Sequence, residues 1–104
     1  MTTSSEDRRE GASAAAIARA ARTLRALAHP QRLKIVDVVR REGPLPVAEI
    51  SRRVRLTQSM TSQHLNRLRE VGVLAARRQG REVWYELADR RCGAVLDCIA
   101  KKGA

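Results

Sequence analysis

Residues 56–87 read LTQSMTSQHLNRLREVGVLAARRQGREVWYEL, a stretch that predicts a helix followed directly by a β-hairpin. Its first half predicts a short helix whose inner side holds the residues spaced i, i+4 and i+7, which are Thr61, Leu65 and Leu68. Thr57 is a suitable N-cap, and Gly72 ends the helix. The opposite side carries short hydrogen-bonding side chains, namely Gln58, Ser59, Ser62, Gln63, Asn66 and Arg67. Such side chains are suited to contacting base edges in a DNA groove, whereas a plain solvated face would more often carry Glu and Lys.

The second half of this stretch predicts a β-hairpin with strands at about residues 73–77 and 82–87, joined around Gln79-Gly80. Alternation assigns one face to the core, formed by Val83, Tyr85 and Leu87, and turns Trp84 the other way. Polar and basic side chains gather at the tip, namely Arg77, Arg78, Gln79 and Arg81. The tip contacts phosphates or enters a minor groove in one interpretation; in the other it only keeps the hairpin end soluble.

The segments before this stretch predict three helices after a disordered tail at residues 1–13. Residues 14–28 form an Ala-rich helix whose narrow apolar stripe, with Ile17 and Leu24, suits packing against a partner chain. A second helix starts at Pro30, ends before Gly43 and is apolar over much of its circumference, as expected of the central core helix. Residues 44–46 form an extended link to a third helix at about 47–54.

The segment after the hairpin predicts a final helix, RRCGAVLDCIAKK, with Asp89 as N-cap. Cys92, Val95, Leu96 and Ile99 form its apolar stripe. An exposed stripe of this kind is a second candidate dimer contact, so the main domain is expected to span residues 14–104 and to form a homodimer.

Length and charge restrict the class of protein. The 104 residues suffice for one small domain, and the formal net charge of +10 favours a polyanionic partner. A solvated basic surface or a membrane-surface protein is the alternative. No apolar run is long enough for a membrane span and no signal peptide is evident, so we expect a cytoplasmic protein without a membrane partner. No nucleophile–base pair, paired-carboxylate cleft or phosphate loop points to an enzyme.

Three segments together resemble the ArsR/SmtB family of bacterial repressors, over about residues 20–90. They are LRALAHPQRLKIVDVV, LTQSMTSQHLNRLREVGVL and QGREVWYEL. The resemblance implies a mainly α (α+β) winged helix-turn-helix homodimer of order α-α-α-α-β-β-α, paired through its first and last helices. It also implies a repressor that occupies an inverted repeat in double-stranded operator DNA and leaves when an inducer binds. The alternative function is an architectural or anti-repressor DNA binder without an effector of its own.

The resemblance assigns DNA contacts to two sets of residues. The recognition helix carries Gln58, Ser59, Ser62, Gln63 and Arg67, and the wing carries Arg77, Arg78, Gln79 and Arg81. His64 either donates to a phosphate or holds the helix to its neighbour, and both roles remain open. His29, before Pro30, is interpreted as a helix-entry residue rather than a ligand. Thr61 stands where the family more often has Val.

The effector is less clearly indicated. The family's thiolate site would lie at the start of the third helix, where this chain has PLPVAEI without sulfur, and the last helix offers Asp89 and Asp97 but no His. We therefore expect no metal site of these kinds. Cys92 and Cys98 lie about 9 Å apart along a regular helix, too far for a disulfide within it. They are candidate thiol sensors of arsenite or another thiophilic inducer, of persulfide or of an oxidant, with basic neighbours lowering a thiol pKa. The alternative is that Cys92 is a buried apolar residue and Cys98 is incidental.

Overall fold

The computed structural model describes the backbone of residues 11–103 and the side chains of residues 11–100. Residues 1–10 of the expected disordered tail lie outside this range. The elements in chain order are α2 (Ala14–Leu27), α3 (Pro30–Glu42), β1 (Leu45–Pro46), α4 (Val47–Val54), α5 (Gln58–Glu70), β2 (Leu74–Gln79), β3 (Glu82–Leu87) and α6 (Arg90–Gly103). The predicted mainly α order is confirmed, with one short strand added between the second and third helices.

Capping side chains set the helix starts. The Thr57 hydroxyl accepts a hydrogen bond from the Met60 N–H at 3.0 Å, and an Asp89 carboxylate oxygen accepts one from the Arg91 N–H at 3.0 Å. His29 caps α3 in the same way, since its Nδ1 accepts from the Gln31 N–H at 3.2 Å while Pro30 takes the first helical position. The caps at Thr57 and Asp89 and the helix-entry role of His29 are therefore confirmed. Ser13, placed in the expected tail, caps α2.

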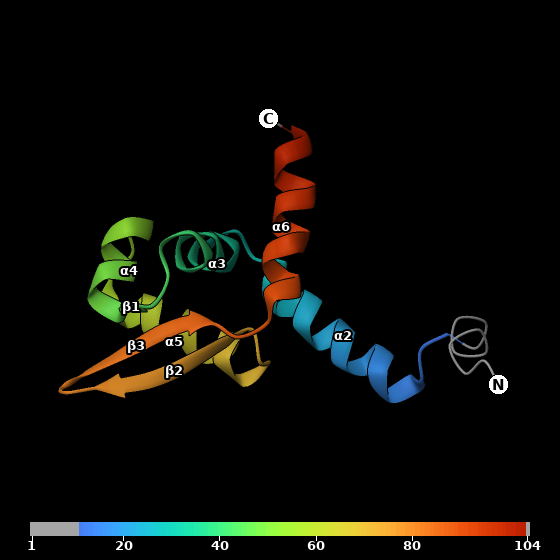
Figure 1. The fold of residues 1–104 in the computed structure, drawn as a ribbon, viewed down its shortest axis with the longest axis horizontal. Coiled ribbons are helices and arrows are strands. Elements are labelled where there is room, and N and C mark those ends of the chain that lie inside the picture. Colours follow the sequence, from blue (N-terminus) through green and yellow to red (C-terminus); the bar gives the residue numbers. More distant parts are fainter. Residues whose placement is uncertain (1–10, 104) are drawn as a thin grey trace.

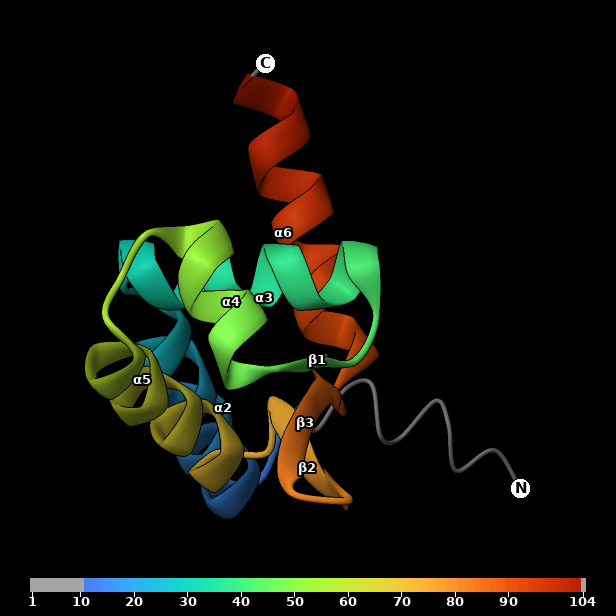
Figure 2. The same cartoon turned by 90° about the vertical axis from the view of Figure 1, so that its left-hand side faces the viewer.

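The core surrounds α3, as its broad apolar surface predicts. Ile35, Val36, Val38 and Val39 of this helix are buried, and α4, α5, β3 and α6 pack against α3. Figure 2 shows α4 and α5 on one side of α3, with the hairpin below and α6 extending away from the other elements. The helix-turn-helix pair and the hairpin thus share one compact core.

The sheet is antiparallel with strand order β1-β3-β2. Residues 44–46 were expected to be an extended link, but Leu45 and Pro46 pair with Tyr85 and Trp84. Two residues are too few to show a period, and proline is tolerated because β1 is an edge strand. Across β3, Tyr85 and Leu87 pack on the core as predicted. Val83 does not, because it lies near the hairpin tip, opposite Arg78.

The hairpin turn is shorter than expected. Gln79 pairs with Glu82, so only Gly80 and Arg81 form the turn, and β2 runs to residue 79 rather than 77. Gly80 has φ 63°, a conformation that glycine adopts without strain at the first position of a two-residue turn. Three of the four expected tip residues, Arg77, Arg78 and Gln79, therefore lie within β2. The alternation along this strand determines the face of the hairpin to which each side chain points.

Figure 1 shows α2 running away from the hairpin tip and α6 standing up from the middle of the molecule. α6 packs on α3 through Arg40, which pairs with Asp97 at 2.7 Å and with Asp37 at 3.0 Å. Gly93 provides room for this arginine, since a Cβ there would come within 3.3 Å of the Arg40 Cδ. The predicted dimer residues remain uncovered: Ile17, Leu24, Val95 and Ile99 are exposed and Leu96 is half-buried.

Candidate nucleic-acid interface

The turn between α4 and α5 spans only three residues. α4 ends at Arg55, which adopts a left-handed conformation with φ 61° and donates its N–H to the Ser51 carbonyl. Leu56 is half-buried, and Thr57 then caps α5. A short turn of this kind holds the second helix at a fixed angle to the first and presents its outer face to solvent.

α5 is anchored by a stripe that is completely buried. Thr61, Leu65 and Leu68 are each 0% exposed, which confirms the predicted inner side. The Thr61 hydroxyl donates to the Thr57 carbonyl at 2.8 Å, so a buried polar group is satisfied within its own helix. This bond explains how a threonine can occupy a fully buried position of the stripe.

The outer face of α5 is polar, as the sequence predicts. Gln58, Ser59, Gln63 and Asn66 are exposed, and Ser62, His64 and Arg67 are half-buried. Arg67 approaches only Glu70 of its own helix, at 3.4 Å. The five residues assigned to DNA contact on this helix, and His64, therefore lie on the surface or at its margin, where a ligand can reach them from one side.

Met60 was missed by the sequence interpretation. It lies on α5 outside the buried stripe and is 47% exposed, although a large apolar side chain gains from burial. Its position off the i, i+4, i+7 pattern is the signal that identifies it. An exposed apolar side chain on a groove-reading helix can pack on a thymine methyl group.

His64 is held by Arg32 of α3, a partner that the sequence analysis did not name. The Arg32 Nε donates to the His64 Nδ1 at 3.3 Å, and the His29 ring lies 4.8 Å from the His64 ring between centroids. Partial burial, and then the proximity of His29 and Arg32, hold the pKa of His64 below its usual 6.5. Of the two roles left open for His64, the contact with a neighbouring helix is present in the structure.

The two wing arginines on β2 point to opposite faces of the hairpin. Arg77 is opposite Trp84 and its guanidinium lies 3.4 Å from Glu86, its diagonal neighbour on β3. Arg78 is opposite Val83, on the face that continues into the core. Among the side chains that the structure describes, Arg78 and the turn residue Arg81 have no carboxylate within ion-pair distance. The wing therefore has two unpaired arginines and one paired arginine.

The two thiols of α6 differ in exposure: Cys92 is buried and Cys98 is exposed. Burial raises the pKa of the Cys92 thiol, and the nearby Asp89 raises it further, against a smaller opposite effect of Arg91. Arg91 lowers the Cys92 pKa, as expected of a basic neighbour, but burial and Asp89 outweigh it, so the pKa of Cys92 is raised. Within residues 11–100, no three His, Cys, Asp or Glu side chains are grouped closely enough to hold a metal ion.

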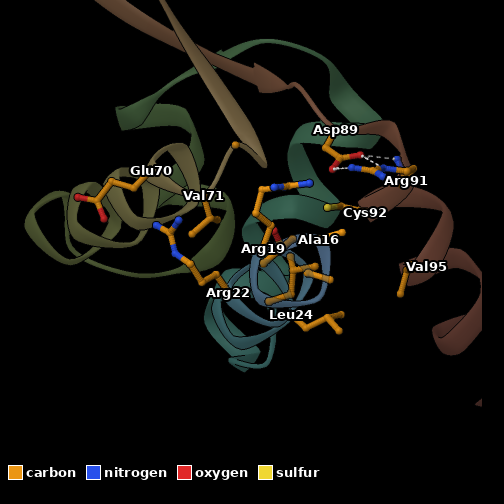
Figure 3. A pocket seen from close by; sticks show the side chains of 14 residues that line it. Ala16, Arg19, Arg22, Leu24, Glu70, Val71, Asp89, Arg91, Cys92 and Val95 are labelled. Carbon is orange, nitrogen blue, oxygen red and sulfur yellow. Dashed lines mark hydrogen bonds and ion pairs between the residues drawn. The ribbon is translucent and has the colours of Figure 1, made fainter. Parts of the chain in front are cut away.

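A cavity of about 590 Å³ lies between α2, the end of α5 and the start of α6 (Figure 3). Its lining includes Arg19 and Arg22 of α2, together with Cys92. The Asp89–Arg91 ion pair, at 2.8 Å, lies at its α6 side.

In the described part of the chain no helix combines the length and apolarity that a membrane crossing requires.

The short α4–α5 turn, the polar α5 face and the adjoining hairpin define a winged helix-turn-helix protein, a class of DNA-binding regulators rather than enzymes. The chain belongs to the bacterial arsR family of regulatory proteins, whose family model matches residues 29–75.

Relatives with known names support this assignment. The HTH-type transcriptional regulator NmtR of Mycobacterium tuberculosis is 40% identical over 82 residues, which cover 79% of this chain and 68% of NmtR. The crystal structure of the transcriptional repressor PagR of Bacillus anthracis has a TM-score of 0.77 at 32% identity, covering 84% of this chain and 99% of PagR. A homodimeric winged helix-turn-helix DNA-binding domain from Mycobacterium bovis also has a TM-score of 0.77, at 27% identity, covering 89% of this chain and 88% of that domain.

Proposed function

We propose that the chain is a dimeric, sequence-specific transcriptional repressor that binds an inverted-repeat operator and is released by an effector. The observation that carries this proposal is the two-sided character of α5. Its inner side is a stripe that is 0% exposed, and its outer side presents hydrogen-bonding side chains to solvent. A rigid helix with short polar side chains can place donors and acceptors against base edges. Operator binding in a bacterium would place the protein in the cytoplasm.

Gln58, Ser59, Ser62, Gln63 and Arg67 contact bases or adjacent phosphates in this proposal. Arg78, Gln79 and Arg81 of the wing contact the flanking backbone. Arg77 contributes less, because Glu86 already neutralises part of its charge. The net charge of +10 supports the electrostatic part of such binding.

Dimer formation follows from the apolar surface between α2 and α6. A groove of about 320 Å³ there is lined by apolar side chains, among them Leu24, Val95, Leu96 and Ile99. Ile17 extends the same surface along α2 and is 57% exposed. Covering this surface with a second copy would remove it from water and would present two α5 helices to one duplex.

Release by a thiophilic effector such as arsenite would act through α6. Cys98 is the accessible thiol, and Cys92 is disfavoured because it is buried with a raised pKa. Each arsenic–sulfur bond would form as a thiol proton leaves with an arsenite hydroxyl group as water. Replacement of Cys98 by Ser should then prevent arsenite from releasing DNA, while Cys92→Ser should not. Normal release from both variants would remove the thiols from the proposal.

Selection from a random duplex library, followed by footprinting, tests operator recognition. The proposal expects a two-fold-symmetric footprint with half-sites about one helical turn apart. Gln63→Ala should change the selected sequence, whereas the matched control Arg78→Ala should weaken binding to all sequences. Uniform binding to every duplex would instead support the architectural alternative.

A further inference from the structure

One guanidinium group joins three helices beside the outer face of α5. The Arg32 Nε donates to the His64 Nδ1 at 3.3 Å, and its Nη1 donates to the Ala26 carbonyl at 3.2 Å. Arg32 lies in α3, His64 in α5 and Ala26 near the end of α2. The orientation of the His64 ring is therefore set from the core side of α5.

The direction of this hydrogen bond determines which nitrogen of His64 carries the proton. Because Nδ1 accepts from Arg32, neutral His64 must carry its hydrogen on Nε2. Within residues 11–100, Arg40 Nε is the one buried side-chain nitrogen or oxygen without a partner. Among the residues that the structure describes, the His64 Nε2 has no hydrogen-bond partner and is not fully buried, so its N–H is available to a ligand.

His64 lies at the edge of the outer face rather than at its centre. The preceding residue, Gln63, is exposed, the following residue, Leu65, is buried, and His64 itself is half-buried. When a helix enters a major groove, its central face meets the base edges and its margins face the walls, where the phosphates lie. The N–H at Nε2 therefore lies where a hydrogen-bond acceptor of the backbone is expected.

We propose that Arg32 is a positioning residue that fixes His64 in the Nε2–H form, and that His64 donates this hydrogen to a phosphate oxygen of the bound duplex. This inference rests on the proposed DNA-binding function. His64 thus acts through both ring nitrogens, one toward the protein core and one toward DNA. The contact is a neutral hydrogen bond, in contrast to the charged contacts of the wing.

Two amide substitutions separate the roles of the two ring nitrogens. In His64→Asn, the side-chain oxygen can replace Nδ1 as acceptor for Arg32, but no donor reaches the Nε2 position. In His64→Gln, the amide N–H can replace the Nε2 donor. We expect His64→Asn to weaken operator binding about 3- to 10-fold, the effect of one lost hydrogen bond, and His64→Gln to remain within about 2-fold of the wild type.

The salt dependence of binding distinguishes this contact from a charged one. Loss of a neutral donor should leave the slope of log Kd against log salt unchanged, whereas Arg81→Ala should lower it by about one. Arg32→Met should weaken binding like His64→Asn, and this effect should disappear in a His64→Ala background. Additive losses in the double variant, or equal affinity of the Asn, Gln and wild-type proteins, would overturn the proposal.

Nuclear magnetic resonance tests the protonation state without DNA. Long-range proton–nitrogen correlation spectra of the free protein should show hydrogen on Nε2 of His64, and Arg32→Met should yield a mixture of both tautomers. Hydrogen on Nδ1 in the wild type would overturn the inference even if operator binding is confirmed. Failure of the wild type to select any sequence would overturn the proposed function and, with it, the phosphate contact of His64. The spectra would still show whether Arg32 fixes the tautomer of His64.

Discussion

α5 and α6 are similar helices whose apolar stripes have different surroundings. They have 13 and 14 residues, each begins after a capping side chain, and each carries an apolar stripe. The stripe of α5 is completely buried within the chain, while Val95 and Ile99 of α6 are 43% and 68% exposed. The chain therefore completes its core around α5 but leaves part of the apolar stripe of α6 exposed, the surface proposed above for a second copy.

The largest expected effect comes from a charge placed in the uncovered stripe. Ile99→Arg should produce a monomer, because two guanidinium groups would be buried together at the α2–α6 surface. Loss of the second half-site contact should weaken operator binding by about 100-fold or more. Sedimentation velocity and fluorescence anisotropy measure both effects. Ala94→Arg, on an exposed part of α6 away from the stripe, is the charge-matched control. A dimeric Ile99→Arg protein would contradict this use of α6.

Replacing one leucine of α5 and one of α6 by alanine tests the same difference between the two helices. Leu65→Ala should lower the free energy of unfolding by about 2–5 kcal/mol, since a fully buried side chain leaves a cavity. Leu96→Ala should cost less and should act mainly through dimer stability. Urea unfolding measures the first loss, and sedimentation velocity at several protein concentrations measures the second, because Leu96→Ala should raise the dimer dissociation constant. An unchanged dissociation constant for Leu96→Ala would contradict the placement of Leu96 in the dimer interface.

The two arginines of β2, Arg77 and Arg78, allow a comparison with smaller expected effects on DNA binding. Arg78→Ala should weaken binding to any duplex several-fold and reduce the salt slope by about one. Arg77→Ala should have a smaller effect, because Arg77 is already paired with Glu86 at 3.4 Å. Titrations at a series of salt concentrations give both slopes. Equal slopes for the two variants would show that the Arg77–Glu86 pair opens on DNA binding.

The smallest expected effect is the pH dependence of stability through His64. Partial burial, then His29 and Arg32, lower its pKa in the folded chain from 6.5, so the unfolded chain binds the proton more readily. This contribution to stability is present above pH 6.5 and is lost as pH falls toward the lower folded value. Urea midpoints measured between pH 7 and pH 5 should fall more steeply for the wild type than for His64→Asn. Parallel curves would show that His64 does not contribute.

Much of the fold could be predicted because it depends on local patterns. The Thr57 cap, Pro30 at the start of α3 and the buried stripe of α5 follow from neighbouring residues. The two-residue strand β1 and the Arg32–His64 bond could not, because each joins residues 32 or more positions apart with no repeating pattern. The opposite directions of Arg77 and Arg78 required the hairpin register, which depends on the turn formed by Gly80 and Arg81.

The candidate site was predicted in outline for the same reason. The polar face of α5 is a property of one helix, so its residues could be chosen from their spacing. The partners that alter each side chain lie elsewhere, as with Glu86 beside Arg77 and the burial of Cys92. Met60 was missed because only hydrogen-bonding side chains were chosen for the outer face, although the position of Met60 off the apolar stripe exposes it.

The tight hairpin turn restricts how related chains can vary in length. Because side chains alternate along β2 and β3, inserting one residue into each strand would turn Tyr85 outward and exchange the faces of Arg77 and Arg78. Inserting two residues into each strand would keep both faces and extend the tip by about 7 Å. Natural insertions and deletions in this hairpin should therefore add or remove an even number of residues in each strand.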